Sequence, residues 1–112
     1  NLLEGVVDGV EDSMLRIRSG IGMLYSSHVE LKKGRTVLIR PENISVGAAA
    51  PSVNRFEAEY LSGTFLGERC ELKFRTADGW ILDVNEDSSE LREAGKRYTL
   101  SVLPQNIILL ED

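Results

Sequence analysis

The feature that most constrains the fold of this chain is the alternation of apolar and polar residues over 69–85. In residues 69–76, RCELKFRT, the apolar or small residues are every second one: Cys70, Leu72, Phe74 and Thr76. Residues 80–85, WILDVN, alternate in the same way. A period of two places successive side chains on opposite faces of a β-strand, whereas a helix has a period near 3.6. The segment therefore predicts two strands that share one buried face.

The loop Ala77–Gly79 between these strands decides their register. A two-residue loop would set Phe74 opposite Asp83, which places an apolar residue against a polar one. A three-residue loop sets Phe74 opposite Leu82 and buries one common face. It also puts Gly79 where a type I turn followed by a bulge requires a positive φ. We therefore predict the three-residue loop.

The first half of the chain carries a similar but weaker hairpin pattern. Leu15 and Ile17 precede the tripeptide 18–20, Arg-Ser-Gly, and Ile21 and Met23 follow it. The same three-residue loop would pair Ile17 with Ile21 and Leu15 with Met23. Further strands are expected at 2–8, 36–40, 54–62, 97–103 and 106–110.

Helix signals are poor in this sequence. The only candidates are a short turn at Pro41–Ile44 and one turn at Ser88–Ala94, which a serine would cap and Gly95 would end. Short strands with glycine-rich turns are typical of small barrels and sandwiches. The predicted fold class is therefore all-β, with small barrels like the OB fold.

Composition limits the class of protein. The 112 residues, 42% apolar and 28% charged, are typical of one soluble domain or two very small ones. No apolar run approaches the roughly 20 residues that a membrane span needs. The net charge of −5 counts against nucleic acid as the main partner, because phosphate-binding proteins usually carry a basic surface. Cys70 is the single cysteine, so an internal disulfide is excluded, and its place on the apolar face predicts a buried, inert thiol.

The opening sequence, NLLEGVVDG, is not typical of a native start. It has no initiator methionine and lacks the basic and then apolar regions of a signal peptide. We therefore expect the chain to be a piece of a longer protein.

The chain repeats itself loosely at an offset of 63 residues. Residues 36–46 read TVLIRPENISV and residues 99–109 read TLSVLPQNIIL, which aligns Pro41 with Pro104. Proline cannot donate a hydrogen bond to a β-ladder, so each strand is expected to stop there and turn into a last short strand.

The openings of the two halves also match, but at an offset of 53. Residues 1–5 read NLLEG and residues 54–58 read NRFEA. The change of offset requires an insertion in the second half. We predict two related lobe-forming halves at about 1–47 and 54–112, joined by a linker at 48–53.

Residues 37–44, VLIRPENI, followed after the linker by a strand that opens with asparagine and then by 65–67, FLG, resemble a known family. They resemble the transport-associated OB (TOBE) region of the ATP-binding subunits of ABC importers. The opening 1–5 is similar to the junction where that family leaves its nucleotide-binding domain, and 106–110 resembles its last strand. The resemblance covers nearly the whole chain, and it implies two related OB-like lobes built from both halves.

The resemblance also implies a function. This chain would be a non-catalytic regulatory and dimerisation domain, while ATP and Mg²⁺ would bind to a domain upstream of Asn1. The parent would be a cytoplasmic ATPase at the inner face of the cell membrane, docked on a membrane permease and paired with a second copy of itself. No phosphate loop of the type G-x-x-x-x-G-K-[ST] occurs in this sequence, so no cofactor is expected here.

Five residues are candidates for an interface or a ligand contact: Arg40, Glu42, Asn43, Phe65 and Leu66. Arg40 and Glu42 flank a proline at a strand end, where they would form a subunit contact or a ligand clamp. The alternative is an exposed surface pair worth about 0–1 kcal/mol. For Phe65 and Leu66, which precede a glycine, burial in the core is favoured over an interface.

Metal sites are not supported by the spacing. If the acidic stretch 83–94 were a calcium loop, position six would be Ser88 instead of glycine and position twelve would be Ala94 instead of glutamate. A solvated acidic loop is the favoured interpretation. One histidine, His28, and one cysteine do not supply the three or four ligands of a zinc site.

Two other functions stay open, both for a stand-alone OB-type module. Binding of single-stranded nucleic acid needs a basic groove with exposed aromatics, whereas this chain is acidic and Trp80 is expected to cover the core. Binding of an oxyanion needs clustered donors, to which 26–27, Ser-Ser, and 32–34, Lys-Lys-Gly, could contribute.

Overall fold

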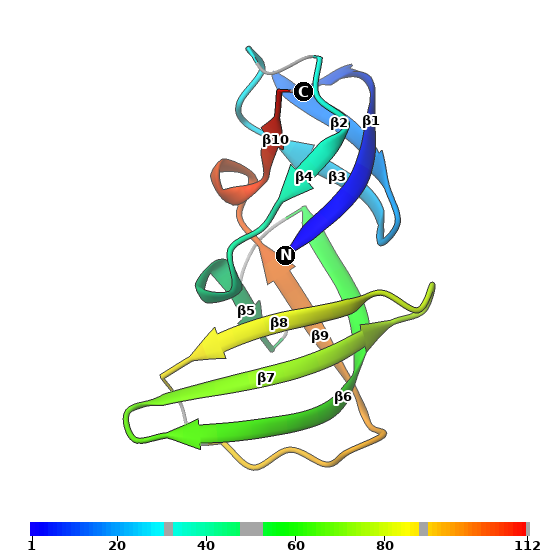
Figure 1. Cartoon of the computed structure of the whole chain (residues 1–112). Coiled ribbons are helices and arrows are strands. Elements are labelled where there is room, and N and C mark those ends of the chain that lie inside the picture. Colours follow the sequence, from blue (N-terminus) through cyan, green and yellow to red (C-terminus); the bar gives the residue numbers. More distant parts are fainter. Residues whose placement is uncertain (31–32, 48–52, 88–89, 112) are drawn as a thin grey trace.

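The computed structural model describes residues 1–30, 33–47, 53–87 and 90–111, and it confirms the all-β class (Figure 1). The elements of the first half are β1 (Leu2–Glu11), β2 (Met14–Ser19), β3 (Gly22–Ser26), β4 (Thr36–Leu38), the 3₁₀ helix η1 (Pro41–Asn43) and β5 (Ile44–Val46). The elements of the second half are β6 (Asn54–Leu66), β7 (Arg69–Thr76), β8 (Ile81–Glu86), β9 (Arg97–Val102), the 3₁₀ helix η2 (Pro104–Asn106) and β10 (Ile108–Leu110).

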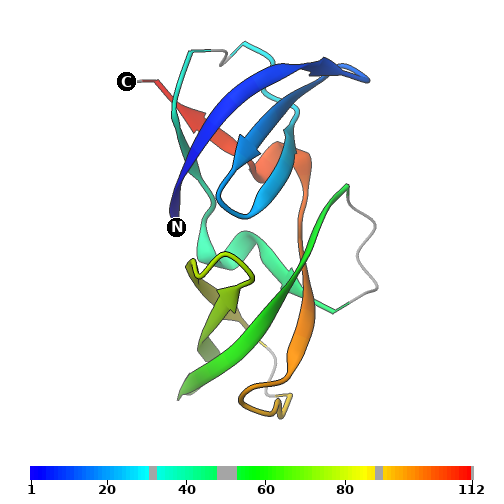
Figure 2. The same cartoon turned by 90° about the vertical axis from the view of Figure 1, so that its right-hand side faces the viewer.

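The strands form two antiparallel sheets, which define two lobes. Lobe A has the order β10-β4-β1-β2-β3 and lobe B the order β5-β9-β6-β7-β8. Strand β5, from the first half, pairs with β9 in lobe B, and β10, from the second half, pairs with β4 in lobe A. The segments β4–η1–β5 and β9–η2–β10 therefore run between the lobes and join them (Figures 1 and 2).

The two lobes share their strand registers. Val7 pairs with Ile17 in lobe A, and Tyr60 pairs with Phe74 in lobe B. Directly after Val7 and after Tyr60, the register shifts at a β-bulge. A bulge bends its strand and increases the local twist, so both sheets curve at the same place. The sequence repeat is therefore a structural repeat.

The insertion in the second half is divided over three connections. The hairpin between β6 and β7 is four residues longer than the one between β1 and β2. The turn before β8 has one residue more than the turn before β3. The path from β8 to β9 is five residues longer than the path from β3 to β4. Together they account for the change of offset from 53 to 63.

The predicted register of the second-half hairpin is confirmed. Phe74 pairs with Leu82 and Leu72 pairs with Val84, and all four side chains are buried. Gly79 has a φ of 89°, as the three-residue loop requires.

The predicted register of the first-half hairpin is wrong. Ile17 pairs with Leu24 and not with Ile21, and Met23 is 39% exposed. The turn holds two residues, Gly20 and Ile21, which is one residue fewer than the turn of the second-half hairpin. The observed register places two buried side chains opposite each other, which satisfies the core better than the three-residue loop does.

Several predicted boundaries also shift. Strand β6 continues to Leu66, four residues beyond its predicted end, and the turn predicted at Pro41–Ile44 is the 3₁₀ helix at Pro41–Asn43. In the turn predicted at Ser88–Ala94, residues 88–89 lie outside the described residues, and 90–94 contain no helix. Residues 48–52 of the expected linker also lie outside the described part of the chain.

The core runs through both lobes, and the contact between them includes Trp80. A Cβ atom added to Gly20 of lobe A would lie 2.0 Å from Trp80 Nε1 of lobe B, so glycine alone fits this close approach. Trp80 is half-buried and packs against the core, as expected, and Cys70 is buried. None of the described residues forms a helix of the length and apolar character that crossing a membrane requires.

Candidate functional site

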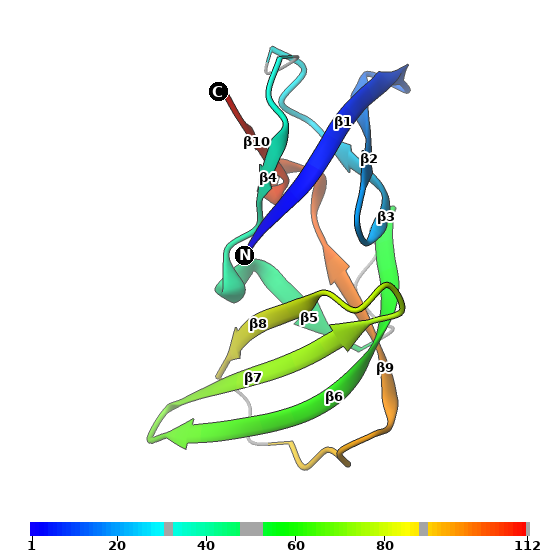
Figure 3. The ribbon, with the colours of Figure 1, turned by 45° about the vertical axis from the view of Figure 1, so that its right-hand side comes forward.

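Two asparagine side chains cap the free edges of β3 and β8. Asn54 Oδ1 accepts a hydrogen bond from Tyr25 N at 2.7 Å, and Asn54 Nδ2 donates to Tyr25 O at 2.9 Å. Asn1 makes the same two bonds to the main chain of Asp83, at 2.7 Å and 2.9 Å. Because an amide has both a donor and an acceptor, each side chain substitutes for a neighbouring strand at one residue. We call these contacts the asparagine clamps; Figure 3 shows the amino terminus beside β8.

Beyond its clamp, β3 is bonded directly to the segment η2–β10, and we call this junction the seam of lobe A. Three hydrogen bonds close it, from Ser26 Oγ to Ile107 O (2.6 Å), from Ser27 N to Pro104 O (3.2 Å) and from His28 Nε2 to Gln105 O (2.8 Å). A carbonyl oxygen only accepts, so His28 Nε2 carries a proton in this bond. Ser26 is completely buried, so its hydroxyl seals the seam from water.

The seam of lobe B, between β8 and the segment η1–β5, lacks this set of donors. The strand registers make Leu24 of β3 equivalent to Leu82 of β8. The residues equivalent to the three donors are therefore Val84, Asn85 and Glu86. Val84 has no donor in its side chain, and the Glu86 carboxylate binds Arg92. No hydrogen bond joins Asn85 N to Pro41 O in the part of the chain that the structure describes. The same architecture therefore closes the seam of lobe A with three hydrogen bonds and leaves the seam of lobe B without that set, and in this sense we call the seam of lobe B open.

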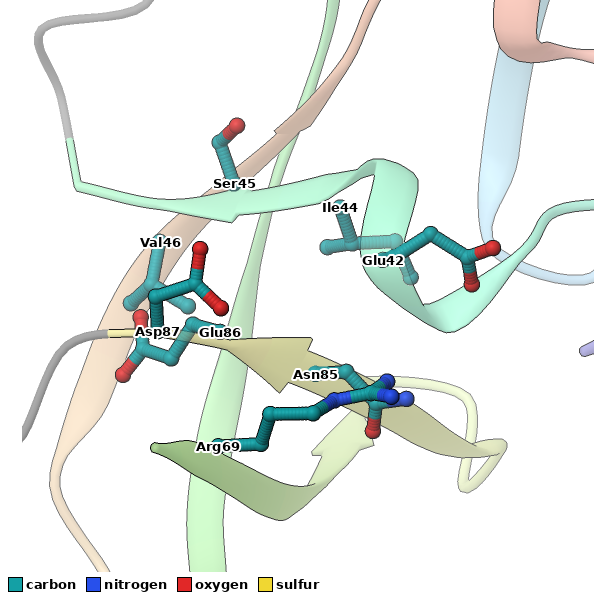
Figure 4. Close-up of a pocket in the computed structure, with 8 residues that line it drawn as sticks. All are labelled: Glu42, Ile44, Ser45, Val46, Arg69, Asn85, Glu86 and Asp87. Carbon is teal, nitrogen blue, oxygen red and sulfur yellow. The ribbon is translucent and has the colours of Figure 1, made fainter. Parts of the chain in front are cut away.

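A pocket of about 540 Å³ lies at the seam of lobe B (Figure 4). Its lining comes from η1, β5, β7 and β8 and from the residue after β8: Glu42, Ile44, Ser45, Val46, Arg69, Asn85, Glu86 and Asp87. This volume is in the range of small ligand sites. Three carboxylates stand against one guanidinium in the lining, so the pocket favours a cation over an anion.

The ion pair of Arg92 with Glu86 borders the pocket. The Arg92 side chain is 6% exposed, and its two Nη atoms bind the two carboxylate oxygens of Glu86. Arg92 Nη2 also bonds Glu90 Oε2 at 3.3 Å, and the guanidinium lies 5.9 Å from the ring centroid of Tyr98. A bidentate pair of this kind is strong and directional. The ion pair neutralises the charge of Glu86 and holds the segment around Arg92 against lobe B.

Arg69 is held near the pocket by Asn85. With the Asn85 amide oriented to satisfy its neighbours, its oxygen accepts from Arg69 Nη2 at 3.0 Å and its nitrogen donates to Val84 O at 3.3 Å. Figure 4 shows the two side chains lying together beneath β5. The one guanidinium in the lining is therefore already engaged.

Both clamped residues carry a further polar contact. Lys73 Nζ donates to Asp83 Oδ1 at 2.7 Å, and this hydrogen bond to a carboxylate raises the pKa of Lys73. Tyr25 Oη donates to Glu11 Oε2 at 3.1 Å, which raises the pKa of Tyr25. All four side chains are at the surface, so these two contacts contribute little to the stability of the fold.

Three of the sequence-predicted site residues lie at η1. Glu42 lines the pocket. Arg40 is exposed, and its carbonyl oxygen accepts a hydrogen bond from Asn43 N at 2.9 Å. Asn43 is half-buried. The structure thus brings one of the three, Glu42, into the pocket.

Phe65 and Leu66 lie far along the hairpin between β6 and β7, and each is 56% exposed. The interpretation that favoured burial in the core for them is wrong. This hairpin is four residues longer than its counterpart in lobe A, so its end extends beyond the core that the other strands enclose. As consecutive residues of a strand they lie on opposite faces of the hairpin, so each face carries one exposed apolar side chain at the end of lobe B.

The remaining pocket residues were not singled out as site residues in the sequence. Asn85 and Asp87 belong to the acidic stretch that was interpreted as a solvated loop, and Arg69 belongs to the polar face of its strand. The repeat in the sequence did not carry this signal, because its offsets of 53 and 63 do not align Ser26 with Val84 or His28 with Glu86; only the strand registers do so.

Comparison with known proteins agrees with this architecture. Residues 37–110 match the family model of the TOBE domain. No curated protein sequence matches the chain. A solved structure of ModG, described as a cytoplasmic molybdate-binding protein and determined with molybdate bound, superimposes with a TM-score of 0.83 at 12% identity. The match covers 100% of this chain and 96% of that one. At this identity, the likeness shows the fold.

Proposed function

The chain belongs to the TOBE domain family, and we propose that it is the regulatory and dimerisation domain of the ATP-binding subunit of an ABC-type importer. The family match over 37–110 carries the proposal, because it begins at the VLIRPENI motif that resembles the importer ATPases. In this proposal ATP and Mg²⁺ bind to a domain upstream of Asn1. The parent protein is cytoplasmic and reaches the inner face of the membrane through a permease.

The proposed mechanism is mechanical and not catalytic. Two copies hold each other through this domain while the ATP-binding domains close and open. A bound partner or solute biases that equilibrium only by its difference in affinity for the two states. Phe65 and Leu66 supply exposed apolar surface suited to contact with the second copy.

Light scattering of the full-length protein tests the proposal. A dimer is expected, and the double substitution Phe65→Ser/Leu66→Ser should raise its dissociation constant at least tenfold. Val10→Ser is the matched control, because Val10 is similarly exposed but lies in lobe A, and it should leave the dimer unchanged. A monomeric full-length protein, or an upstream sequence without a phosphate-binding loop, would contradict the importer assignment.

Binding of an oxyanion is the second candidate, and the observation that favours it is the likeness to the molybdate-binding ModG over the whole chain. Two features weigh against it here. Ser26 Oγ and Ser27 N–H are used in the seam of lobe A, and the pocket of lobe B is lined mainly by acids. Calorimetry with molybdate, tungstate and sulfate distinguishes the two: a saturable heat would support the oxyanion site.

A further inference from the structure

Main-chain groups of β5 are directed into the open seam of lobe B. Gly47 N–H donates to Thr99 O at 2.8 Å, which makes these two residues a hydrogen-bonded pair of the ladder with β9. Bonded and non-bonded pairs alternate along antiparallel strands. The next residue, Val46, lies opposite Leu100 and is therefore a non-bonded position. Its N–H and C=O point away from β9, toward the pocket that it lines.

The same argument applies to β8 on the other side of the pocket. Thr76 N–H donates to Trp80 O at 2.9 Å, so alternate residues from Trp80 onward direct their main chain toward β7. The intervening residues face outward, and Asp83 shows this because Asn1 binds its N–H and C=O. Asn85, two residues further on, has its main chain directed toward the seam.

Among the residues that the structure describes, the open seam has no side-chain donor at the two positions equivalent to Ser26 and His28. In lobe A the carbonyls of Gln105 and Ile107 are bound by a histidine ring and a serine hydroxyl. The equivalent carbonyls in lobe B belong to Glu42 and Ile44, and the positions of the two donors hold Val84 and Glu86. The Glu42 and Asp87 carboxylates add negative charge at the two ends of this pocket (Figure 4). What complements this seam is positively charged and rich in N–H donors.

The pocket is large enough for a short stretch of extended chain. A strand rises about 3.3 Å per residue, with strands about 4.8 Å apart and sheets about 10 Å apart, which is about 160 Å³ per residue. A pocket of about 540 Å³ therefore accommodates about three residues. That is also the length of β5.

We propose that the seam of lobe B binds an extended, arginine-bearing segment of a partner protein. The main chain of the segment pairs with the outward-facing groups of Val46 and Asn85, as in recognition by strand addition. Arginines two residues apart lie on the same face of an extended segment, and one guanidinium bonds Glu42 at one end of the pocket while the other bonds Asp87 at the other end. This inference goes beyond the proposed function and does not depend on the importer assignment.

An NMR titration of the 112-residue chain tests this inference, and the probe is a pentapeptide of alternating valine and arginine that is blocked at both ends. The amide signals of Val46 and Asn85 should shift, while those of Ser26 and Ser27 at the closed seam should not. The same peptide with citrulline in place of arginine should bind at least fivefold more weakly. Shifts centred elsewhere, or equal binding of the citrulline peptide, would overturn the proposal.

Variants separate strand addition from general electrostatic attraction. Asn85→Pro removes one N–H that faces away from β7, so the sheet should remain intact while the peptide loses its main-chain partner. Glu42→Gln/Asp87→Asn should weaken binding at least fivefold. Glu57→Gln/Asp78→Asn, with the same change of charge outside the seam, should leave it within twofold.

Each of these results decides the question. If Asn85→Pro does not fold, the two charge variants still provide the test. Equal weakening by both pairs of charge substitutions would mean a non-specific acidic surface. Shifts of Val46 and Asn85 on concentrating the chain alone would mean that a second copy occupies the seam.

Discussion

Lobe A and lobe B have the same strand order, the same bulges and the same asparagine clamps, yet the hydrogen bonding at their seams differs. In lobe A three donors close the seam, whereas in lobe B a pocket lies at the equivalent place. The frame shared by the lobes is therefore set by main-chain pairing and buried apolar residues. A few side chains at one edge decide whether the edge is sealed or available for binding.

The longer connections of lobe B lead to the same conclusion. The extra residues between β6 and β7 carry the exposed Phe65 and Leu66, and the longer path after β8 begins beside the pocket with Asp87. Insertion at turns leaves the strand registers intact, since the bulges and clamps of the two lobes still correspond. The longer connections therefore give lobe B surface residues that lobe A lacks, while the strand order and registers of the two lobes stay the same.

The largest expected effect is at the buried clamp. Asn54 is almost fully buried, so Asn54→Ala leaves Tyr25 N–H and C=O without these partners and should lower the free energy of unfolding by about 3 kcal/mol. Asn1→Ala removes the equivalent clamp at a half-buried position, where water can replace it, and should cost about 1 kcal/mol. Urea denaturation measures both. Equal losses would show that burial does not distinguish the clamps.

The next effect is at the ion pair of Arg92 with Glu86 in lobe B. Arg92→Met leaves the Glu86 carboxylate without its bidentate partner and should destabilise the chain by about 2 kcal/mol. Adding Glu86→Gln removes the remaining charge and should recover part of the loss. A double variant as unstable as the sum of the two single ones would contradict the pairing. Thermal unfolding of the four proteins completes this cycle.

Ser26→Val tests the seam directly, because it gives lobe A the residue that lobe B has at Val84. The Ile107 carbonyl loses its buried donor, and the expected loss of stability is about 1–2 kcal/mol. Amide hydrogen exchange should become faster at Ser27, whose N–H bonds Pro104 O in the closed seam. If stability and exchange both stay as in the parent chain, the hydroxyl does not hold the seam closed.

The smallest effect concerns the surface pair beside the Asn1 clamp. The Asp83 carboxylate raises the pKa of Lys73 in the folded state. Its stabilising contribution is therefore fully present below the unfolded pKa and is lost as the pH rises through the folded pKa. Lys73→Gln should reduce stability slightly at pH 7 and flatten the decline in alkaline solution. A difference between the two proteins that stays constant through that range would contradict this assignment.

Much of the fold could be predicted from the sequence, because its signals are local. The alternation in 69–76 predicted the hairpin of β7 and β8 together with its register. The same reasoning gave a wrong register around Gly20, since it carried over a loop length from a half that is one residue longer at this turn. Phe65 and Leu66 were assigned to the core because their chemistry is apolar, whereas the length of the hairpin places them beyond it.

The sequence by itself determined the class of structure: strands from two-residue alternation, turns at glycines, and a repeat that breaks at Pro41 and Pro104. Only the tertiary structure decided which lobe takes β5 and β10, and which seam is left open. These outcomes depend on hydrogen bonds between residues as far apart as Asn1 and Asp83. Whether two such distant residues come into contact depends on the geometry of every turn between them. Local sequence patterns specify each strand and turn separately, and they do not specify the combined result.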